Sequence, residues 1–173
     1  MQSKTVHDYQ AAPALLQDKV ILVTGAGDGI GRQAALSFAE YGATVILLGR
    51  TVEKLEAVYD EIIALGLAEP AIVPLDLKGA TKQNYIDMSS TIAEQFGKLD
   101  GALLNASILG ELTPFTQIHE QVFNDVMQVN VTAQYLLAQA LIPTLQLADN
   151  ASLVFTSSSV GNQGRAYWGP YSI

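Results

Sequence analysis

Short apolar segments alternate with longer amphipathic segments along most of the chain, and this alternation limits the folds open to it. The apolar segments are bounded by charged residues, glycine or proline, as is typical of strands buried on both faces. Amphipathic segments of helical length separate them, which predicts βαβ units and a parallel sheet. The predicted strands cover residues 19–24, 44–48, 71–75, 100–104 and 152–156.

The predicted helices cover residues 32–41, 52–65, 81–96 and 120–141, with Pro143 near the end of the last one. Right-handed crossovers between the strands place helices on both faces of the sheet, which gives a doubly wound, three-layer α/β/α fold of the Rossmann type. A length of 173 residues suits one domain with a sizeable core. We therefore predict an N-terminal arm over residues 1–17 and a single α/β domain over residues 18–173.

Composition argues against several classes of function. The formal net charge is −8 at pH 7, and the nine Lys and Arg residues are scattered, whereas nucleic-acid-binding proteins need clustered cations. The same acidity disfavours docking on anionic lipid. The chain has no cysteine, and its Asp, Glu and His residues lack the spacing of metal ligands, so no metal site is predicted. There is no signal-peptide pattern and no membrane-spanning apolar run, so we expect a cytoplasmic protein.

The segment TGAGDGIG lies between the first predicted strand and the first predicted helix. A turn at this point presents amide N–H groups where an anion can bind, and glycines let the backbone approach a pyrophosphate closely. The strand–turn–helix context favours dinucleotide binding over a glycine-rich turn that serves only helix–strand packing. The predicted cofactor contacts in this loop are Thr24, Gly25, Gly27, Asp28, Gly29, Ile30 and Gly31.

The second predicted strand is followed by Gly49 and Arg50, where dinucleotide-binding proteins often have an acidic residue for the ribose hydroxyls. A guanidinium in place of a carboxylate favours a 2′-phosphate, so NADP is preferred over NAD. NAD stays open, because Arg50 could be a solvated loop charge and Asp28 is a poor neighbour for an extra phosphate.

Several motifs, in order along the chain, closely resemble those of the short-chain dehydrogenases/reductases. The resemblance extends from about residue 17 onward, and the segment 154–161 and the Gly49–Arg50 strand end resemble an uncharacterised bacterial group within the family. The motif positions are the TGxxxGxG pattern at residues 24–31, Asp76–Leu77, Asn105–Ala106, Asn130, and Ser158 with Tyr171 thirteen residues later.

The resemblance implies an enzyme that interconverts a carbonyl and a secondary alcohol by hydride transfer with NADP or NAD. Tyr171 would be the general acid/base, Ser158 would donate a hydrogen bond to the substrate oxygen, and Asn130 would hold a water in the proton relay. Asp76, followed by Leu77, would accept a hydrogen bond from the adenine amino group. Asn105 and Ala106 would contact the cofactor and would belong to a motif that braces the central sheet.

The chain departs from the family pattern at two places. The family's Asn-Asn-Ala-Gly motif here reads LNAS at residues 104–107, from which we expect weaker loop geometry without lost chemistry. The family's catalytic Lys lies four residues after the Tyr, beyond Ile173; it would bind the ribose and lower the tyrosine pKa, which is ordinarily about 10. We therefore predict a truncated or partly ordered domain without its last strands, and a Lys four residues after Tyr171 in the longer gene product.

Structural alternatives stay open for each catalytic candidate. The serines at 157–159 could cap the next helix, Tyr171 could be a half-buried core residue, and Asn130 could bond a backbone group. At the level of function, the alternatives are a non-catalytic redox sensor or scaffold and, less strongly, a nucleotide-sugar epimerase or dehydratase. Expected partners are a small-molecule carbonyl or alcohol and further copies of the chain in a homodimer or homotetramer.

Overall fold

The computed structural model describes residues 9–173, so His7 and the first part of the predicted arm lie outside the described residues. A five-stranded sheet has the strand order β3-β2-β1-β4-β5, and every neighbouring pair is parallel. The predicted doubly wound fold is therefore confirmed, with the strand order reversing between β1 and β4. The strands are β1 (Val20–Thr24), β2 (Thr44–Gly49), β3 (Ala71–Pro74), β4 (Gly101–Leu104) and β5 (Ser152–Phe155).

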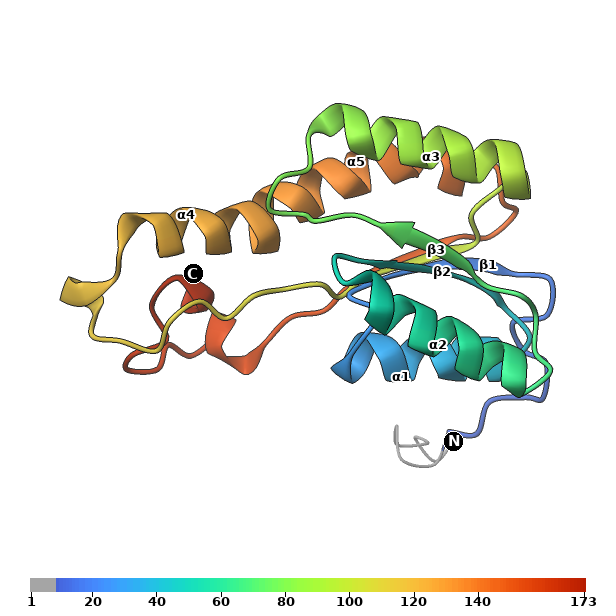
Figure 1. Cartoon of the computed structure of the whole chain (residues 1–173), viewed down its shortest axis with the longest axis horizontal. Helices are drawn as coiled ribbons and strands as arrows, with labels where there is room; N and C mark the ends of the chain where they lie inside the picture. The colour runs from blue at the N-terminus through green and yellow to red at the C-terminus, as the bar shows by residue number, and fades with distance from the viewer. Residues whose placement is uncertain (1–8) are drawn as a thin grey trace, which may run out of the picture.

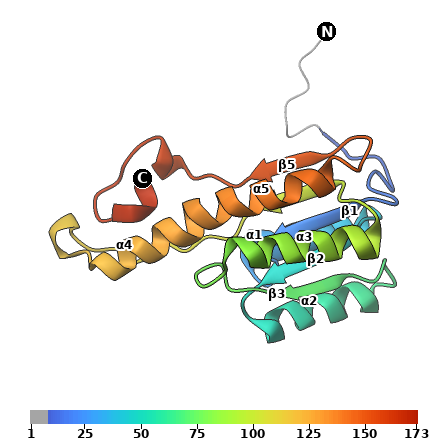
Figure 2. The same cartoon turned by 90° about the horizontal axis from the view of Figure 1, so that it is seen from above.

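Helices cover both faces of the sheet (Figure 1). One face carries α1 (Gly29–Glu40) and α2 (Val52–Ala64), and the other carries α3 (Lys82–Phe96) and α5 (Ala133–Leu145), which lie side by side in Figure 2. Successive residues of β1 belong alternately to the two cores, with Leu22 in the α3/α5 core and Val23 in the α1/α2 core. This period of two buries the strand on both faces and explains its unbroken apolar sequence.

Local sequence sets the helix ends. The Asp28 side chain accepts a hydrogen bond from the amide of Gly29, so α1 begins three residues before its predicted start. Thr81 and Asn84 form a reciprocal capping box at the start of α3. Gly97, with φ of 76°, ends α3 in the left-handed conformation that glycine adopts most readily.

The predicted helix over residues 120–141 is wrong in two details. It consists of α4 (Glu120–Met127), a π-helical turn (Gln128–Thr132) and α5, and it continues past Pro143 to Leu145. The wider π turn contains Asn130, and such turns are often found at functional sites. Hydrophobic periodicity alone did not reveal the turn.

After β5 the chain leaves the sheet and runs beneath α4, where the C-terminus also lies (Figure 1). This segment contains two short 3-10 helices, Ser159–Gly161 and Gly169–Ser172, and the second packs against α4. At the other end, the amide of Leu16 donates to the carbonyl of Tyr41, so the last residues of the predicted arm contact the domain. The boundary at residue 18 stays a prediction. Within the described residues, no helix has both the length and the apolar character needed to cross a membrane.

Candidate cofactor and active site

A cavity of about 610 Å³ lies at the carboxyl ends of the strands. Residues that follow each of the five strands line it, including Gly25 after β1, Arg50 after β2, Asp76 after β3, Asn105 after β4 and Ser158 after β5. Doubly wound sheets bind ligands at this edge, and the volume is within the range of small-molecule sites.

Most predicted site residues line this one cavity. They are Gly25, Gly27, Asp28, Gly29, Ile30, Arg50, Asp76, Leu77, Asn105, Ala106, Ser158 and Tyr171. Thr24, Gly31 and Asn130 do not line it, and their contacts show that they support the residues that do. Five polar residues that were not among the predicted site residues also line the cavity: Thr51, Lys54, Ser107, Thr156 and Ser157.

The glycine loop between β1 and α1 leaves no room for side chains at two points. A Cβ on Gly31 would lie 2.2 Å from the carbonyl oxygen of Gly25. Gly25 itself has φ of 68°, and a Cβ there would lie 3.1 Å from the Cα of Ala106. The loop therefore needs glycine at both positions to pack this closely, and its amides and the start of α1 form a cradle that fits a pyrophosphate.

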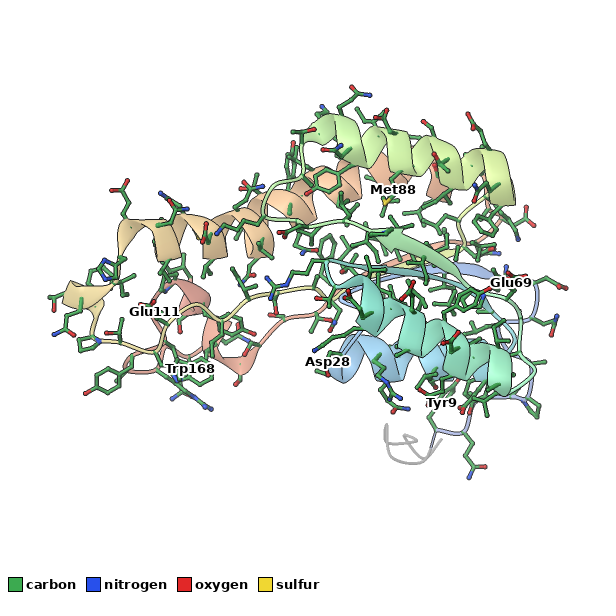
Figure 3. All side chains as sticks on the ribbon, viewed as in Figure 1. Tyr9, Asp28, Glu69, Met88, Glu111 and Trp168 are labelled. Atoms are coloured by element: carbon green, nitrogen blue, oxygen red, sulfur yellow. The ribbon has the colours of Figure 1, made fainter. Side chains whose placement is uncertain are left out.

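Asp28 and Lys54 form an ion pair on the cavity wall. The Lys54 Nζ lies 2.5 Å from Asp28 Oδ2, and Figure 3 shows Asp28 at the start of α1. The pKa of Asp28 lies below its ordinary value, chiefly because Lys54 donates a hydrogen bond to it and also because the amide of Gly29 does. Sequence reasoning missed Lys54, which lies in α2, because its partner lies 26 residues earlier in the glycine loop.

Thr24 joins the ends of β1 and β4. Its buried Oγ1 accepts hydrogen bonds from the amides of Asn105 and Ala106, both at 2.9 Å. The Asn105 Nδ2 donates to the Thr24 carbonyl at 3.3 Å, and the Thr156 Oγ1 donates to Asn105 Oδ1 at 3.2 Å. The polar side chains thus connect three strand ends, which agrees with the bracing role that the family resemblance implied for Asn105.

The Asp76 loop after β3 is fixed from two sides. The amide of Lys78 donates to Asp76 Oδ1 at 3.0 Å, and the Lys78 Nζ lies 2.6 Å from Asp125 Oδ2 on α4. The hydrogen bond from Lys78, with a second one from Gln121, lowers the pKa of Asp125. The predicted adenine-binding loop is therefore tied to the helix that precedes the π turn.

Ser158 and Tyr171 line the same cavity as the glycine loop, although they come from the segment after β5. The Ser158 Oγ accepts a hydrogen bond from the amide of Val160 at 3.5 Å, which caps a short helix, as the structural alternative held. This bond uses an oxygen lone pair and leaves the hydroxyl proton free to be donated. Tyr171 packs against Trp168, with their ring centroids 5.9 Å apart.

Asn130 lies in the π turn and binds backbone, as its structural alternative predicted. Its Oδ1 accepts from the amide of Ile108 and its Nδ2 donates to the carbonyl of Ile108, both at 2.9 Å. Four residues later, the buried Gln134 donates to the carbonyl of Ala106 at 2.9 Å. These two side chains hold the segment after β4 that lines the cavity. Gln134 was missed because one amide on a largely apolar helix gives no pattern.

The sequence profile of the short chain dehydrogenase family matches residues 19–173, which include the cavity and all five strands. The chain belongs to the short-chain dehydrogenase family. The family resemblance drawn from the motifs is thus confirmed, and the bacterial group within it is that of YciK.

Among family members, the chain is 52% identical to the uncharacterized oxidoreductase YciK of Escherichia coli K12 over 164 residues, 95% of this chain and 65% of that protein. A short-chain dehydrogenase structure from Pseudomonas syringae matches with a TM-score of 0.93 and 49% identity, over 95% of this chain and 68% of that one. A structure from Escherichia coli CFT073, complexed with NADPH, matches with a TM-score of 0.89 and 52% identity, over 92% and 66%. The chain therefore spans about two thirds of the length of these family members.

Proposed function

We propose that the protein is an NADP(H)-dependent oxidoreductase that interconverts a carbonyl compound and a secondary alcohol. One observation carries the proposal: Ser158 and Tyr171 line the same cavity as the glycine loop. A hydroxyl and a phenol beside a dinucleotide cradle are the groups that carbonyl reduction needs. A sensor that only binds the cofactor needs neither.

The cofactor preference for NADP follows from charges at the end of β2. Arg50 and Lys54 both line the cavity there, and the residue that follows Gly49 in the sequence is Arg50, with no carboxylate at the strand end. Guanidinium and ammonium groups favour a 2′-phosphate over a bare ribose hydroxyl. The relative from Escherichia coli CFT073, which is 52% identical, is complexed with NADPH, in keeping with this preference.

The proposed chemistry divides among three side chains. When bound, NADPH supplies the hydride. In reduction, Tyr171 donates its phenolic proton to the substrate oxygen, and in oxidation it accepts a proton from the alcohol. The Ser158 hydroxyl donates a hydrogen bond to the same oxygen and stabilises the charge that develops on it. Asn130 positions the cavity wall through Ile108 and, in this proposal, holds a water of the proton relay.

The Lys expected four residues after Tyr171 completes the proposal. Its ammonium would bind the ribose of the cofactor and favour the ionised form of the nearby phenol. The tests below are therefore made on a chain long enough to include that position.

The direct experiment measures NADPH and NADH binding by nucleotide fluorescence, followed by turnover of a panel of carbonyl compounds. We expect binding of NADPH and reduction of at least one carbonyl. NADPH binding without turnover of any carbonyl or alcohol would contradict the catalytic part and favour the sensor.

Tyr171→Phe sharpens this experiment. Removal of the phenolic proton is expected to lower kcat by about 10²–10⁴-fold, the usual contribution of general acid–base catalysis, and to leave the Kd for NADPH nearly unchanged. Tyr167→Phe is the matched control, because Tyr167 lies in the same segment but does not line the cavity. An unchanged kcat in Tyr171→Phe would contradict the assigned role.

We also propose that the protein is a cytoplasmic homodimer or homotetramer. Exposed apolar side chains follow one another along α4, the π turn and α5, and a second copy could cover them. They are Phe123, Val131, Tyr135 and Ile142. Sedimentation of the protein at several concentrations measures the oligomeric state directly, and a monomer at all concentrations would contradict this part.

A further inference from the structure

Asp28 places a carboxylate in the loop beside which the 2′-phosphate of NADP(H) would bind. Its side chain is 76% exposed and lines the cavity together with Arg50. A lone carboxylate here would repel a phosphate dianion and would also accept hydrogen bonds from a ribose 2′-hydroxyl. Taken alone, Asp28 therefore favours NADH, in conflict with the NADP preference that Arg50 indicates.

Lys54 removes this conflict. Its Nζ lies 2.5 Å from Asp28 Oδ2, so the carboxylate is neutralised where it faces the cavity. The side-chain stem is held against the glycine loop: a Cβ on Gly27 would lie 2.8 Å from the Lys54 Cβ. Lys54 also lies in the first turn of α2, four residues after Arg50, and lines the same cavity.

Other cations do not replace Lys54 in this role. Arg32 is the other cation that acts on Asp28, but its guanidinium is paired with Glu61. Arg50 lines the cavity and has no ion pair or hydrogen bond to another side chain among residues 9–173. An ammonium has three donors, and the bond to Asp28 uses one of them, so Lys54 retains donors for a phosphate.

We propose that Lys54 sets the cofactor preference by neutralising Asp28 and by binding the 2′-phosphate together with Arg50. The inference rests on the proposed use of NADP(H). It assigns opposite roles to two neighbouring residues: Lys54 favours NADPH, and Asp28 without Lys54 favours NADH.

The test is fluorescence titration of NADPH and NADH with wild type, Lys54→Met and the double variant Lys54→Met/Asp28→Asn. Methionine retains the stem that packs on the loop and removes the charge. We expect Lys54→Met to weaken NADPH binding by about tenfold or more, as loss of a charge-assisted bond to phosphate implies, with NADH binding unchanged or tighter. Asp28→Asn in the Lys54→Met background should restore part of the NADPH affinity, because the repelling charge is gone.

The matched control is Lys98→Met, which removes the same charge at the amino ends of the strands, far from the cavity. There Lys19 still pairs with Asp100. It should leave the ratio of the two affinities unchanged, and thermal unfolding of each variant confirms that it is folded. Equal weakening of NADPH and NADH by Lys54→Met, or no recovery in the double variant, overturns the proposal.

Because the readout is binding, the result is separable from the proposed function. A wild-type protein that binds NADPH but turns over no carbonyl loses its catalytic assignment, and the result for Lys54 still stands. A wild-type protein that binds neither nucleotide contradicts the proposed function and this inference together.

Discussion

The two walls of the cavity are built differently. The strand β1, which leads into the glycine loop, is buried along its whole length and pairs with β2 on one side and β4 on the other. The strand β5, which leads to Ser158, pairs only with β4 among the described residues, and its Val154 and Phe155 are 52% and 53% exposed. Within residues 9–173, the cofactor wall (residues 25–31, after β1) is therefore held by strand pairing on both sides, whereas the catalytic wall (residues 157–171, after β5) is held by strand pairing on one side.

Individual hydrogen bonds attach the catalytic wall to the rest of the molecule. The amide of Thr156 donates to the carbonyl of Leu104 at 3.0 Å, and the amide of Thr113 donates to the carbonyl of Tyr167 at 3.2 Å. Tyr167 has φ of 72°, an uncommon conformation for a residue with a side chain. Segments with few buried contacts open at lower free energy than core strands, so within this chain of 173 residues the catalytic wall should be displaced more easily than the cofactor wall.

Gly31→Ala should have the largest effect on cofactor binding, because it disrupts the cofactor wall. The new methyl group would lie 2.2 Å from the carbonyl oxygen of Gly25, so the loop must move. If the loop loses one or two amide bonds to a pyrophosphate, NADPH binding weakens roughly a hundredfold, as fluorescence titration would show. The overpacking should also lower the free energy of unfolding by about 1–3 kcal/mol.

Gly79→Ala is the control for this substitution. A Cβ at Gly79 meets no atom within 4 Å, and its φ is not positive, so binding and stability should stay near those of wild type. Wild-type NADPH affinity in Gly31→Ala would mean that the loop does not hold the cofactor.

Asp100→Asn should have a smaller effect, confined to stability, because Asp100 lies at the amino ends of β1 and β4. Although burial alone would raise the pKa of Asp100, hydrogen bonds from the amide of Val20 and from Lys19 and Lys98 lower it below 3.8. A lowered folded-state pKa stabilises the fold above about pH 4, and this stabilisation is lost as the pH falls through the folded-state value.

The expected result for Asp100→Asn is a free energy of unfolding lower by about 1–3 kcal/mol at pH 7, with a weaker loss of stability below about pH 4. Urea unfolding at several pH values measures both quantities. If the free energy of unfolding falls with pH as in wild type, Asp100 does not anchor the strand. An altered NADPH affinity would show that the amino and carboxyl ends of the strands are coupled.

The same contrast explains what the sequence could predict. The strand–glycine loop–helix unit is contiguous, so its apolar run, its glycines and the burial of the strand on both faces were all predictable from residues 19–41. Ser158 and Tyr171 were found only through the family motif, because nothing local places a residue after β5 beside a loop after β1.

Contacts between distant segments were not predictable. Lys54 reads as one more cation on an amphipathic helix until the fold brings it to Asp28. The bonds from Asn130 to Ile108 span 22 residues, and the π turn that presents Asn130 leaves no trace in hydrophobic periodicity. In each case the packing of whole helices against the sheet determines which residue becomes the hydrogen-bond or ion-pair partner.

The central claim is that the cofactor wall and the catalytic wall face one and the same ligand. Amide hydrogen exchange with and without NADPH tests it most directly, because it reports on each wall separately. We expect NADPH to slow exchange in peptides that cover Gly25–Gly31 and also in those that cover Ser157–Tyr171. Protection of the first segment with none in the second would contradict a shared site.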